Sequence, residues 1–300
     1  MTALLDPARH AKHRLHKWWW WKRLRLMSTA LEHQHARRPY VFDPARYAHT
    51  FLAFESSGGA VDPQPVPRKV WCAWTGDNEM SPNRAAGLES IRAANPEAEV
   101  ILVTAENLDS FVLPEHPFHP IYPHLSYVHR SDYLRCYLMH HYGGAYTDIK
   151  RQRGSLTDAI DILNDRADLW IVGASQDGLP ARIDGESRLD RDCRRNYDIL
   201  PSGGAFAIRP QTALTTAWWA EVNRRADYYY DLTKTNPGGI WGRDDPGIDN
   251  VGAGDAKRFN PNYPIHWNVL QANVFEPLCL KHQDRIFLDE RFHPSRLDYR

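Results

Sequence analysis

The order of apolar and turn-forming segments from residue 69 to residue 103 constrains the fold of this chain most strongly. Lys69 to Ala73 is a short run of high β-propensity, and Val100 to Val103 is a continuous apolar run typical of a buried parallel strand. A helix is predicted between them, because Ser81-Pro82 is a favoured N-cap and first-turn pair and Asn95-Pro96 is a stop signal. Strand, helix and strand in this order predict a βαβ unit and therefore an α/β protein.

The periodic segments that follow extend this α/β pattern toward the C-terminus. Apolar residues at helical spacing predict a helix from about Tyr127 to Tyr142, which Gly143-Gly144 is expected to cap. Further strands are predicted at 145–149, 169–173 and 205–208, and further helices at 212–230 and 269–282. We expect one sheet covered by helices.

Length and composition are those of an ordinary folded protein. The chain has 300 residues, of which 42% are hydrophobic and 25% charged, and its formal net charge is zero. Because no net charge attracts a polyanion, nucleic acid is not an expected partner. The four cysteines lie far apart and form no CxxC pair, which is typical of idle thiols in a reducing compartment. We expect one domain at 68–300, preceded by an arm and linker at 1–67.

The N-terminal arm differs in composition from the rest of the chain. Trp18 to Trp21 are surrounded by seven basic residues, which are Arg9, Lys12, Arg14, Lys17, Lys22, Arg23 and Arg25. Because Trp favours the lipid headgroup boundary and basic residues favour anionic lipid, one interpretation is a peripheral membrane segment. The other is a solvated basic helix that packs some Trp against the domain, since four adjacent Trp point all round a helix.

The same arm does not have the pattern of a secretory signal. Basic residues follow the four Trp at once, and no apolar run in the chain is long enough to span a bilayer. We therefore expect a cytoplasmic protein, with the inner membrane face as the place of any peripheral contact.

One compact block carries most of the candidate chemistry. It consists of Ser131 to Arg135 and Tyr142 to Lys150, which the predicted helix joins. Asp132 lies three residues before Arg135, so the two share a helix face. Two glycines then turn the chain into a strand, and Asp148 follows at the carboxyl end, where open α/β sheets place ligands.

Such a block suits a substrate that contains a diphosphate. A nucleotide sugar carries a base, a ribose, a diphosphate and a sugar, and its diphosphate gains negative charge as the glycosidic bond breaks. A protein can offset that charge with Mg²⁺ or Mn²⁺ held by one or two carboxylates, with Arg or Lys, or with both. Each residue alone is weak evidence, because an Asp and Arg at this spacing are usually a solvated pair. Their order and spacing together are far more specific.

The block resembles the donor-site segment of the DXD-type sugar transferases, which include α-1,6-mannosyltransferases, capsular polysaccharide synthesis transferases and glucosylating toxins. Their pattern runs Ser-Asp-x-x-Arg, a helix, Tyr-Gly-Gly, an apolar pair and Asp-x-Asp. Val70 to Gly76 is similar to the family's first strand, which ends in Trp-x-Gly, and Asn95-Pro96 resembles its Asn-Pro after the first helix. The resemblance covers roughly residues 67–155 well and the remainder loosely.

The resemblance implies a fold, a reaction and a set of site residues. The implied fold is of GT-A type, a Rossmann-like mixed, mainly parallel sheet flanked by helices. The implied reaction moves a hexose from a UDP- or GDP-sugar to a glycan, lipid-linked or surface-polysaccharide acceptor, usually with retention of anomeric configuration. By position, the implied contacts are Asp132 with ribose or sugar hydroxyls, Arg135 with the diphosphate or sugar, Asp148 with the sugar or a metal, and Trp74, Gly76, Gly144 and Tyr146 with the donor.

Lys150 stands where the family has the second aspartate of Asp-x-Asp. A protonated lysine cannot ligate Mn²⁺ or Mg²⁺, and its charge repels the ion. Three readings are open. In the first, Asp148 holds the metal together with a later acid, which is Asp244, Asp245 or Asp249. In the second, Lys150 itself offsets the diphosphate charge. In the third, the site is degenerate, and the domain only binds a nucleotide or glycan and docks to a membrane or partner. We favour catalysis by Asp148, Lys150 and Arg135, with Asp148 and Asp245 as the metal ligands.

Two further segments and four absent motifs complete the sequence argument. Small residues from Pro201 to Phe206 either let a sugar approach the backbone closely or form a tight turn. Gly242 to Gly247 is either a lid over the donor or a surface loop. The chain has no GxxxxGK, GxGxxG, GxSxG or HExxH motif, which disfavours kinase, dehydrogenase, serine hydrolase and zinc protease functions.

Overall fold

A six-stranded sheet in the order β2-β1-β3-β5-β4-β6 organises the described part of the chain. The computed structural model describes residues 37–54, 64–176, 187–243 and 259–294, together with Leu26, 29–31 and 33–35. The strands are β1 (Lys69–Trp74), β2 (Glu99–Thr104), β3 (Gly144–Thr147), β4 (Ile171–Ser175), β5 (Pro201–Ile208) and β6 (Ile286–Leu288). β1 pairs in parallel with β2 and β3, and β4 with β6, whereas β5 runs antiparallel to β3 and β4. This mixed, mainly parallel sheet confirms the expected α/β fold and is consistent with the GT-A type.

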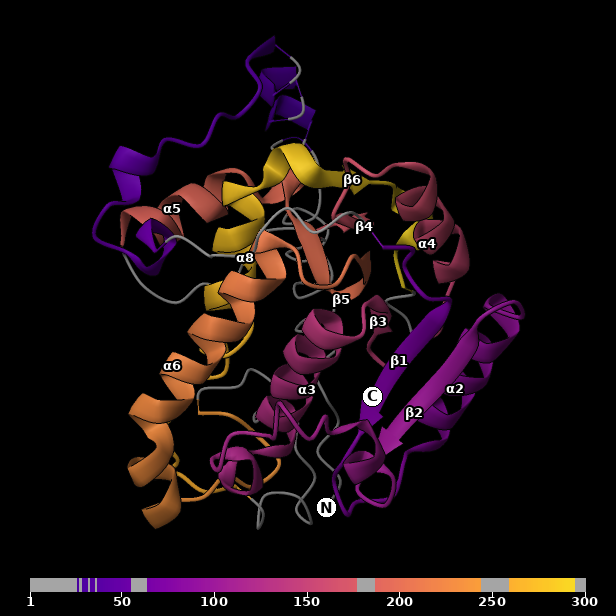
Figure 1. The fold of residues 1–300 in the computed structure, drawn as a ribbon, viewed down its shortest axis with the longest axis vertical. Helices are drawn as coiled ribbons and strands as arrows, with labels where there is room; N and C mark the ends of the chain where they lie inside the picture. The colour runs from indigo at the N-terminus through magenta and orange to yellow at the C-terminus, as the bar shows by residue number, and fades with distance from the viewer. Residues whose placement is uncertain are drawn as a thin grey trace, which may run out of the picture.

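Helices cover both faces of the sheet (Figure 1). They are α2 (Pro82–Ala94), α3 (Tyr127–His141), α4 (Leu156–Asp165), α5 (Arg188–Arg195), α6 (Ala213–Thr235) and α8 (Ala272–Lys281), with short 3-10 turns that include η1 (Pro44–Tyr47) and η2 (Phe51–Ala53). Successive strand residues point to opposite faces. Val70 and Cys72 therefore join a buried cluster with α2 and α4, while Trp71 joins a larger cluster with α3, α6 and α8. The result is three layers, with the sheet in the middle.

The first βαβ unit forms as the sequence predicts. The Ser81 hydroxyl accepts a hydrogen bond from the backbone N of Arg84, Pro82 occupies the first turn of α2, and Asn95 ends the helix. β2 then returns parallel to β1. The interpretation of 201–206 as a tight turn is wrong, because these residues begin strand β5, which pairs with β3 and β4.

The described part of the N-terminal arm packs on the helices of the larger cluster. Tyr47 and Leu52 are buried in it, and the Arg46 guanidinium contacts both carboxylate oxygens of Asp192 at 2.8 and 2.7 Å. Trp18 to Trp21 and the linker residues 56–63 lie outside the described residues. The domain boundary between residues 67 and 68 stays a prediction.

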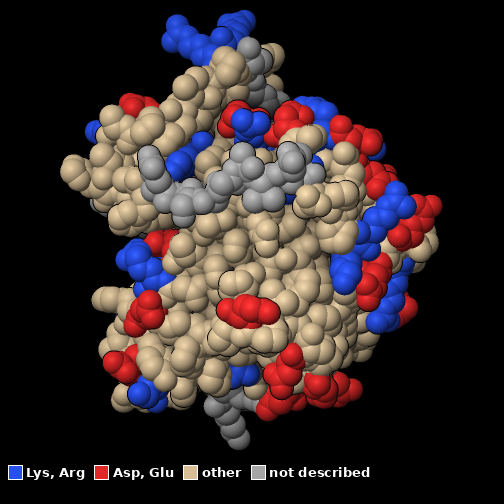
Figure 2. Space-filling model, viewed as in Figure 1, with Lys and Arg blue, Asp and Glu red and all other residues tan. Residues whose placement is uncertain are grey.

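Charges on the molecular surface are mixed in sign. Figure 2 shows basic and acidic side chains interspersed along the edge that β2 and α2 form, beside a broad area where charged side chains are sparse. Among the described residues, none of the helices combines the length and the hydropathy that crossing a membrane requires.

Candidate functional site

Helix α3 and strand β3 bring the two halves of the block together. Ser126 caps α3, where its hydroxyl accepts a hydrogen bond from the backbone N of His129. Gly143 ends the helix with a φ of +67°, and its backbone N donates to the Leu138 carbonyl at 3.0 Å, as the predicted glycine cap requires. The chain then enters β3 alongside β1, so Asp148 emerges at the carboxyl end of a strand inside the sheet.

The Asp148 carboxylate lies between two cations. Its Oδ1 is 3.2 Å from a terminal nitrogen of Arg135, and its Oδ2 is 2.9 Å from the ammonium of Lys150. The Asp148 backbone N donates to the Gly204 carbonyl at 2.8 Å, which ties the residue to β5. The Asp148 side chain keeps 28% of its surface exposed, and that of Lys150 keeps 22%. A ligand can therefore reach both groups from solvent.

Arg135 is the buried centre of the cluster. Besides Asp148, it contacts Oδ1 of Asp132 at 3.5 Å and donates to the Tyr146 hydroxyl at 3.2 Å. Its guanidinium carbon lies 4.3 Å from the centroid of the Tyr146 ring, within cation–π distance. The prediction that Asp132 and Arg135 share a helix face is confirmed. Both side chains are more than nine-tenths buried, so this is no ordinary surface pair.

Electrostatics fix the protonation states of the cluster. Burial would raise the pKa of Asp148, but Lys150 and Arg135, with a smaller effect from Arg84, lower the pKa to about 2. Burial opposes the charge of Arg135, yet Tyr146, Asp148 and Asp132 together raise its pKa above the ordinary value. Burial also raises the pKa of Tyr146, so its hydroxyl stays protonated. Asp148 is an anion near neutral pH and is therefore suited to accept hydrogen bonds or hold a cation rather than to donate a proton.

Two glycines of β5, Gly203 and Gly204, lie beside the cluster. A Cβ atom on Gly204 would lie 3.1 Å from Oδ2 of Asp148 and 3.6 Å from the Lys150 ammonium. A Cβ atom on Gly203 would lie 2.7 Å from the Gln271 amide nitrogen and 3.7 Å from an Arg135 terminal nitrogen. The sequence singled out the small residues at 201–206, but nothing local pointed to Gln271. Only the tertiary structure brings this buried amide from just before α8 to the site.

The other predicted donor contacts occupy different places. Trp74 ends β1, next to β3 in the sheet, and Gly76 follows, so both lie at the same sheet edge as Asp148. The Trp74 ring packs partly against the α2 and α4 cluster, and its Nε1 donates to the Asn78 carbonyl. Gly144 lies at the opposite end of β3, where its φ of +98° lets it pass the Lys69 carbonyl. The structure therefore does not bring Gly144 to the cluster. Asp245 lies outside the described residues, as do Asp244, Asp249 and Gly247.

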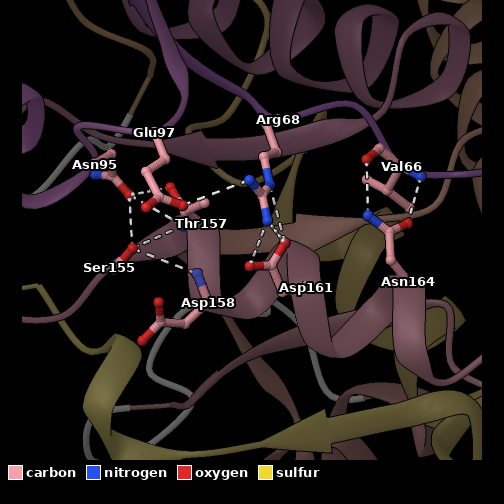
Figure 3. Close-up of polar contacts among 9 residues, drawn as sticks. All are labelled: Val66, Arg68, Asn95, Glu97, Ser155, Thr157, Asp158, Asp161 and Asn164. Carbon is pink, nitrogen blue, oxygen red and sulfur yellow. Dashed lines mark hydrogen bonds and ion pairs between the residues drawn. The ribbon is translucent and has the colours of Figure 1, made fainter.

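Asn95 fixes the far end of the segment that carries Asp148 and Lys150. Its side-chain oxygen accepts hydrogen bonds from the backbone N of Leu156 at 2.7 Å and of Thr157 at 3.1 Å, and its amide donates to the Ile91 carbonyl. Figure 3 shows this side chain pointing to the first turn of α4. The segment from 148 to 155 is thereby anchored at both ends, by β3 and by this contact.

The described residues around Asp148 do not form a donor set for a divalent cation. Each Asp148 oxygen already faces a cationic group, and the position of the second acid holds Lys150. Across the described ranges, no three His, Cys, Asp or Glu side chains are grouped so that they could hold a metal ion. Mg²⁺ needs oxygen ligands in octahedral geometry, and Asp148 supplies the one carboxylate that is both partly exposed and central to the cluster.

A known protein family matches the segment that contains this cluster. Residues 82–150 match the family described as glycosyltransferase sugar-binding region containing DXD motif. No curated protein matches the chain, and no solved structure matches it. The matched segment begins with α2 and ends with Lys150, and it contains Asp132, Arg135 and Asp148. Residues 82–150 of this chain are therefore similar to the sugar-binding region of the DXD-type glycosyltransferases, which supports the family that the sequence resembles.

Proposed function

We propose that this protein transfers a hexose from a nucleoside-diphosphate sugar, a UDP- or GDP-hexose, to a glycan, lipid-linked or surface-polysaccharide acceptor. The observation that carries the proposal is the Asp148 carboxylate, held between Arg135 and Lys150 at the carboxyl end of β3 within the family segment. Ligands of open α/β sheets bind outside the carboxyl ends of the strands. The partly exposed anion and cation meet the two parts of such a donor, the sugar hydroxyls and the diphosphate.

The proposed reaction is a single group transfer. The bond between the anomeric carbon and the diphosphate oxygen breaks, and the nucleoside diphosphate leaves with the electron pair. A hydroxyl oxygen of the acceptor bonds to the anomeric carbon, and its proton passes to the departing phosphate or to water. We propose retention of anomeric configuration, as the family resemblance implies.

Each residue of the cluster has a proposed role. Asp148 accepts hydrogen bonds from sugar hydroxyls, and Lys150 faces the negative diphosphate. Arg135 contacts both Asp148 and Asp132, so it holds the two carboxylates in place as well as supplying positive charge. Trp74 and Gly76 lie at the same sheet edge, where the nucleotide would extend. Asp132 and Tyr146 complete the buried shell around Arg135.

The arm adds a proposed location for the reaction. Four consecutive Trp among seven basic residues suit contact with anionic lipid headgroups, which would bring the enzyme to a lipid-linked acceptor at the cytoplasmic membrane face. This part of the proposal rests on the sequence of residues 9–25.

The function is tested with purified full-length chain and a panel of UDP- and GDP-sugars. Nucleoside diphosphate release is measured by mass spectrometry, and the anomer of any product is determined by NMR. We expect release from one donor, and a decrease of roughly 100-fold or more for Asp148→Asn, because an oriented charged contact to the reacting group is lost. Asp109→Asn changes an exposed carboxylate on the 3-10 turn Leu108–Phe111 and serves as the matched control.

The non-catalytic alternative predicts a different result in the same panel. Lys150 in the acid position is the observation that favours it. A chain that binds a nucleoside diphosphate but releases none from any sugar donor, with glycan acceptors present, would support that alternative and contradict the transferase.

A further inference from the structure

Lys150 occupies the place of an ion in the cluster. Its ammonium lies 2.9 Å from Oδ2 of Asp148, and Lys150 stands at the chain position where an Asp-x-Asp motif has its second acid. An ammonium has three hydrogen-bond donors and no lone pair, so it acts as a counter-ion to the carboxylate and never as a ligand. A divalent cation at the same oxygen would have to displace Lys150 and accept its positive charge as a neighbour.

Further cations surround the same carboxylate. Arg135 contacts Oδ1 at 3.2 Å from the helix side, and Arg84 of α2 reaches the Ile149 carbonyl at 2.7 Å, one residue from Asp148. Asp132 is the other carboxylate of the cluster, and it lies against Arg135. Among the described residues, these three positive groups and two carboxylates give the cluster a net positive charge before any ion binds.

The backbone holds Lys150 in this position. A Cβ atom on Gly87 of α2 would lie 3.2 to 3.4 Å from the backbone atoms of Lys150, so the helix packs directly against that peptide. The Lys150 backbone N donates to the Asp148 carbonyl at 2.7 Å. Gly204 also lies near the ammonium, since a Cβ atom there would stand 3.6 Å from Nζ. The ammonium is therefore a fixed charge at the edge of an open site.

We propose that the Lys150 ammonium takes the place of the divalent cation in this transferase, so that the donor diphosphate binds without Mg²⁺ or Mn²⁺. The inference rests on the proposed function and adds to it the source of the positive charge. A diphosphate oxygen placed against Nζ gains a charge-assisted hydrogen bond, and the same group stabilises the nucleoside diphosphate as it leaves.

The test measures binding of UDP and GDP to the full chain by calorimetry, in EDTA and in Mn²⁺ or Mg²⁺. We expect the wild-type affinity for the preferred nucleotide to change less than about threefold between these conditions, because the fixed ammonium is present in both. Lys150→Ala is expected to bind roughly tenfold more weakly in every condition, and Lys150→Arg to keep most of the affinity. Lys234→Ala, which removes an exposed lysine of α6, is the matched control and should bind like the wild type.

A charge reversal makes the test sharper. Lys150→Asp recreates the Asp-x-Asp pair, so we expect weak binding in EDTA and a gain of roughly tenfold or more on adding Mn²⁺. Thermal unfolding of each variant identifies a loss of binding that comes from misfolding. If the aspartate variant does not fold, the comparison of wild type with the alanine variant still decides the question.

Two outcomes would overturn the inference. One is a wild-type chain whose nucleotide binding disappears in EDTA and returns with Mn²⁺; Asp245→Ala would then show whether that acid completes a metal site with Asp148. The other is an alanine variant that binds as tightly as the wild type. Absence of any nucleoside diphosphate binding, with or without metal, would instead remove the proposed function itself, and the inference would fall with it.

Discussion

The central carbon of the Arg135 guanidinium lies 4.3 Å from the centroid of the Tyr146 ring, while a terminal nitrogen of the same guanidinium donates to the Tyr146 hydroxyl. One arginine thus contacts an aromatic ring and two carboxylates at the same time. A lysine at this position would keep the charge but could not satisfy these partners together.

Arg135→Lys is therefore expected to be a damaging substitution. We expect the free energy of unfolding to fall by roughly 2 kcal/mol, because a buried planar donor loses several charge-assisted contacts. Donor affinity should fall as well, since Asp148 loses one of its two cationic partners. Urea unfolding and calorimetry measure the two effects. Arg92→Lys, an exposed arginine paired with Glu89, is the control, and equal behaviour of both variants would contradict the central role of Arg135.

Gly204→Ala is expected to damage binding more than stability. The added methyl would stand 3.1 Å from Oδ2 of Asp148, at the edge of the open site. We expect roughly a tenfold loss of nucleotide affinity with little change in melting temperature. Gly173→Ala is matched to it, because its methyl would also meet an atom at 3.1 Å, but in Phe206, away from the charges. The proposed steric role of Gly204 would be wrong if only Gly173→Ala reduced binding.

Asn95→Ala is expected to destabilise the fold. The substitution removes the acceptor of the Leu156 backbone N–H, while the Thr157 N–H keeps the Ser155 hydroxyl, and a buried unsatisfied donor costs roughly 1–3 kcal/mol. Thermal and urea unfolding should show the loss. Asn262→Ala, at an exposed asparagine, serves as control. An unchanged stability for Asn95→Ala would mean that the start of α4 finds other acceptors.

Acid should unfold the protein partly through buried histidines. Burial lowers the pKa of His129 to about 4, below its ordinary value of 6.5, and its Nε2 lies 3.2 Å from the His266 carbonyl. The unfolded chain binds this proton more tightly, so stability is full above pH 6.5 and falls as the pH drops toward 4. His129→Gln cannot titrate there, and its unfolding free energy should depend less on pH in that window. A slope equal to that of the wild type would show that His129 contributes nothing to it.

Membrane contact through the arm is tested with the full chain. We expect flotation with vesicles that contain anionic phospholipid and weak flotation with neutral vesicles, because Trp and basic residues act together. Replacing Trp18 to Trp21 with Ser should abolish flotation. A variant that instead lacks the N-terminal residues should end its deletion before residue 47. Tyr47 and Leu52 are buried against the helices, so their loss would disturb the core. Flotation of the Ser variant at the wild-type level would exclude the four Trp as the contact.

Local signals in the sequence account for most of the scaffold. Ser81-Pro82 and Asn95-Pro96 bound α2 as predicted, and Gly143 ends α3 with the positive φ that its lack of a side chain permits. The placement of Asp148 at the end of β3 followed from the same reasoning. These features depend on a few adjacent residues, so they can be read without knowing the rest of the chain.

Contacts between distant segments decided the rest. The pairing of 201–208 as β5 puts Gly203 and Gly204 beside Asp148, and no local pattern separates that strand from a turn rich in small residues. Gln271 reaches the site from before α8, far along the chain. Gly144, by contrast, lies against the Lys69 carbonyl and not beside the cluster. The motif alone identified Asp132, Arg135, Asp148 and Lys150 as one block, because helical and strand periodicity are local properties of the backbone. Which charges meet within that block, and which remote glycines and amides surround it, depends on how the strands pair, and that is settled only when the whole sheet forms.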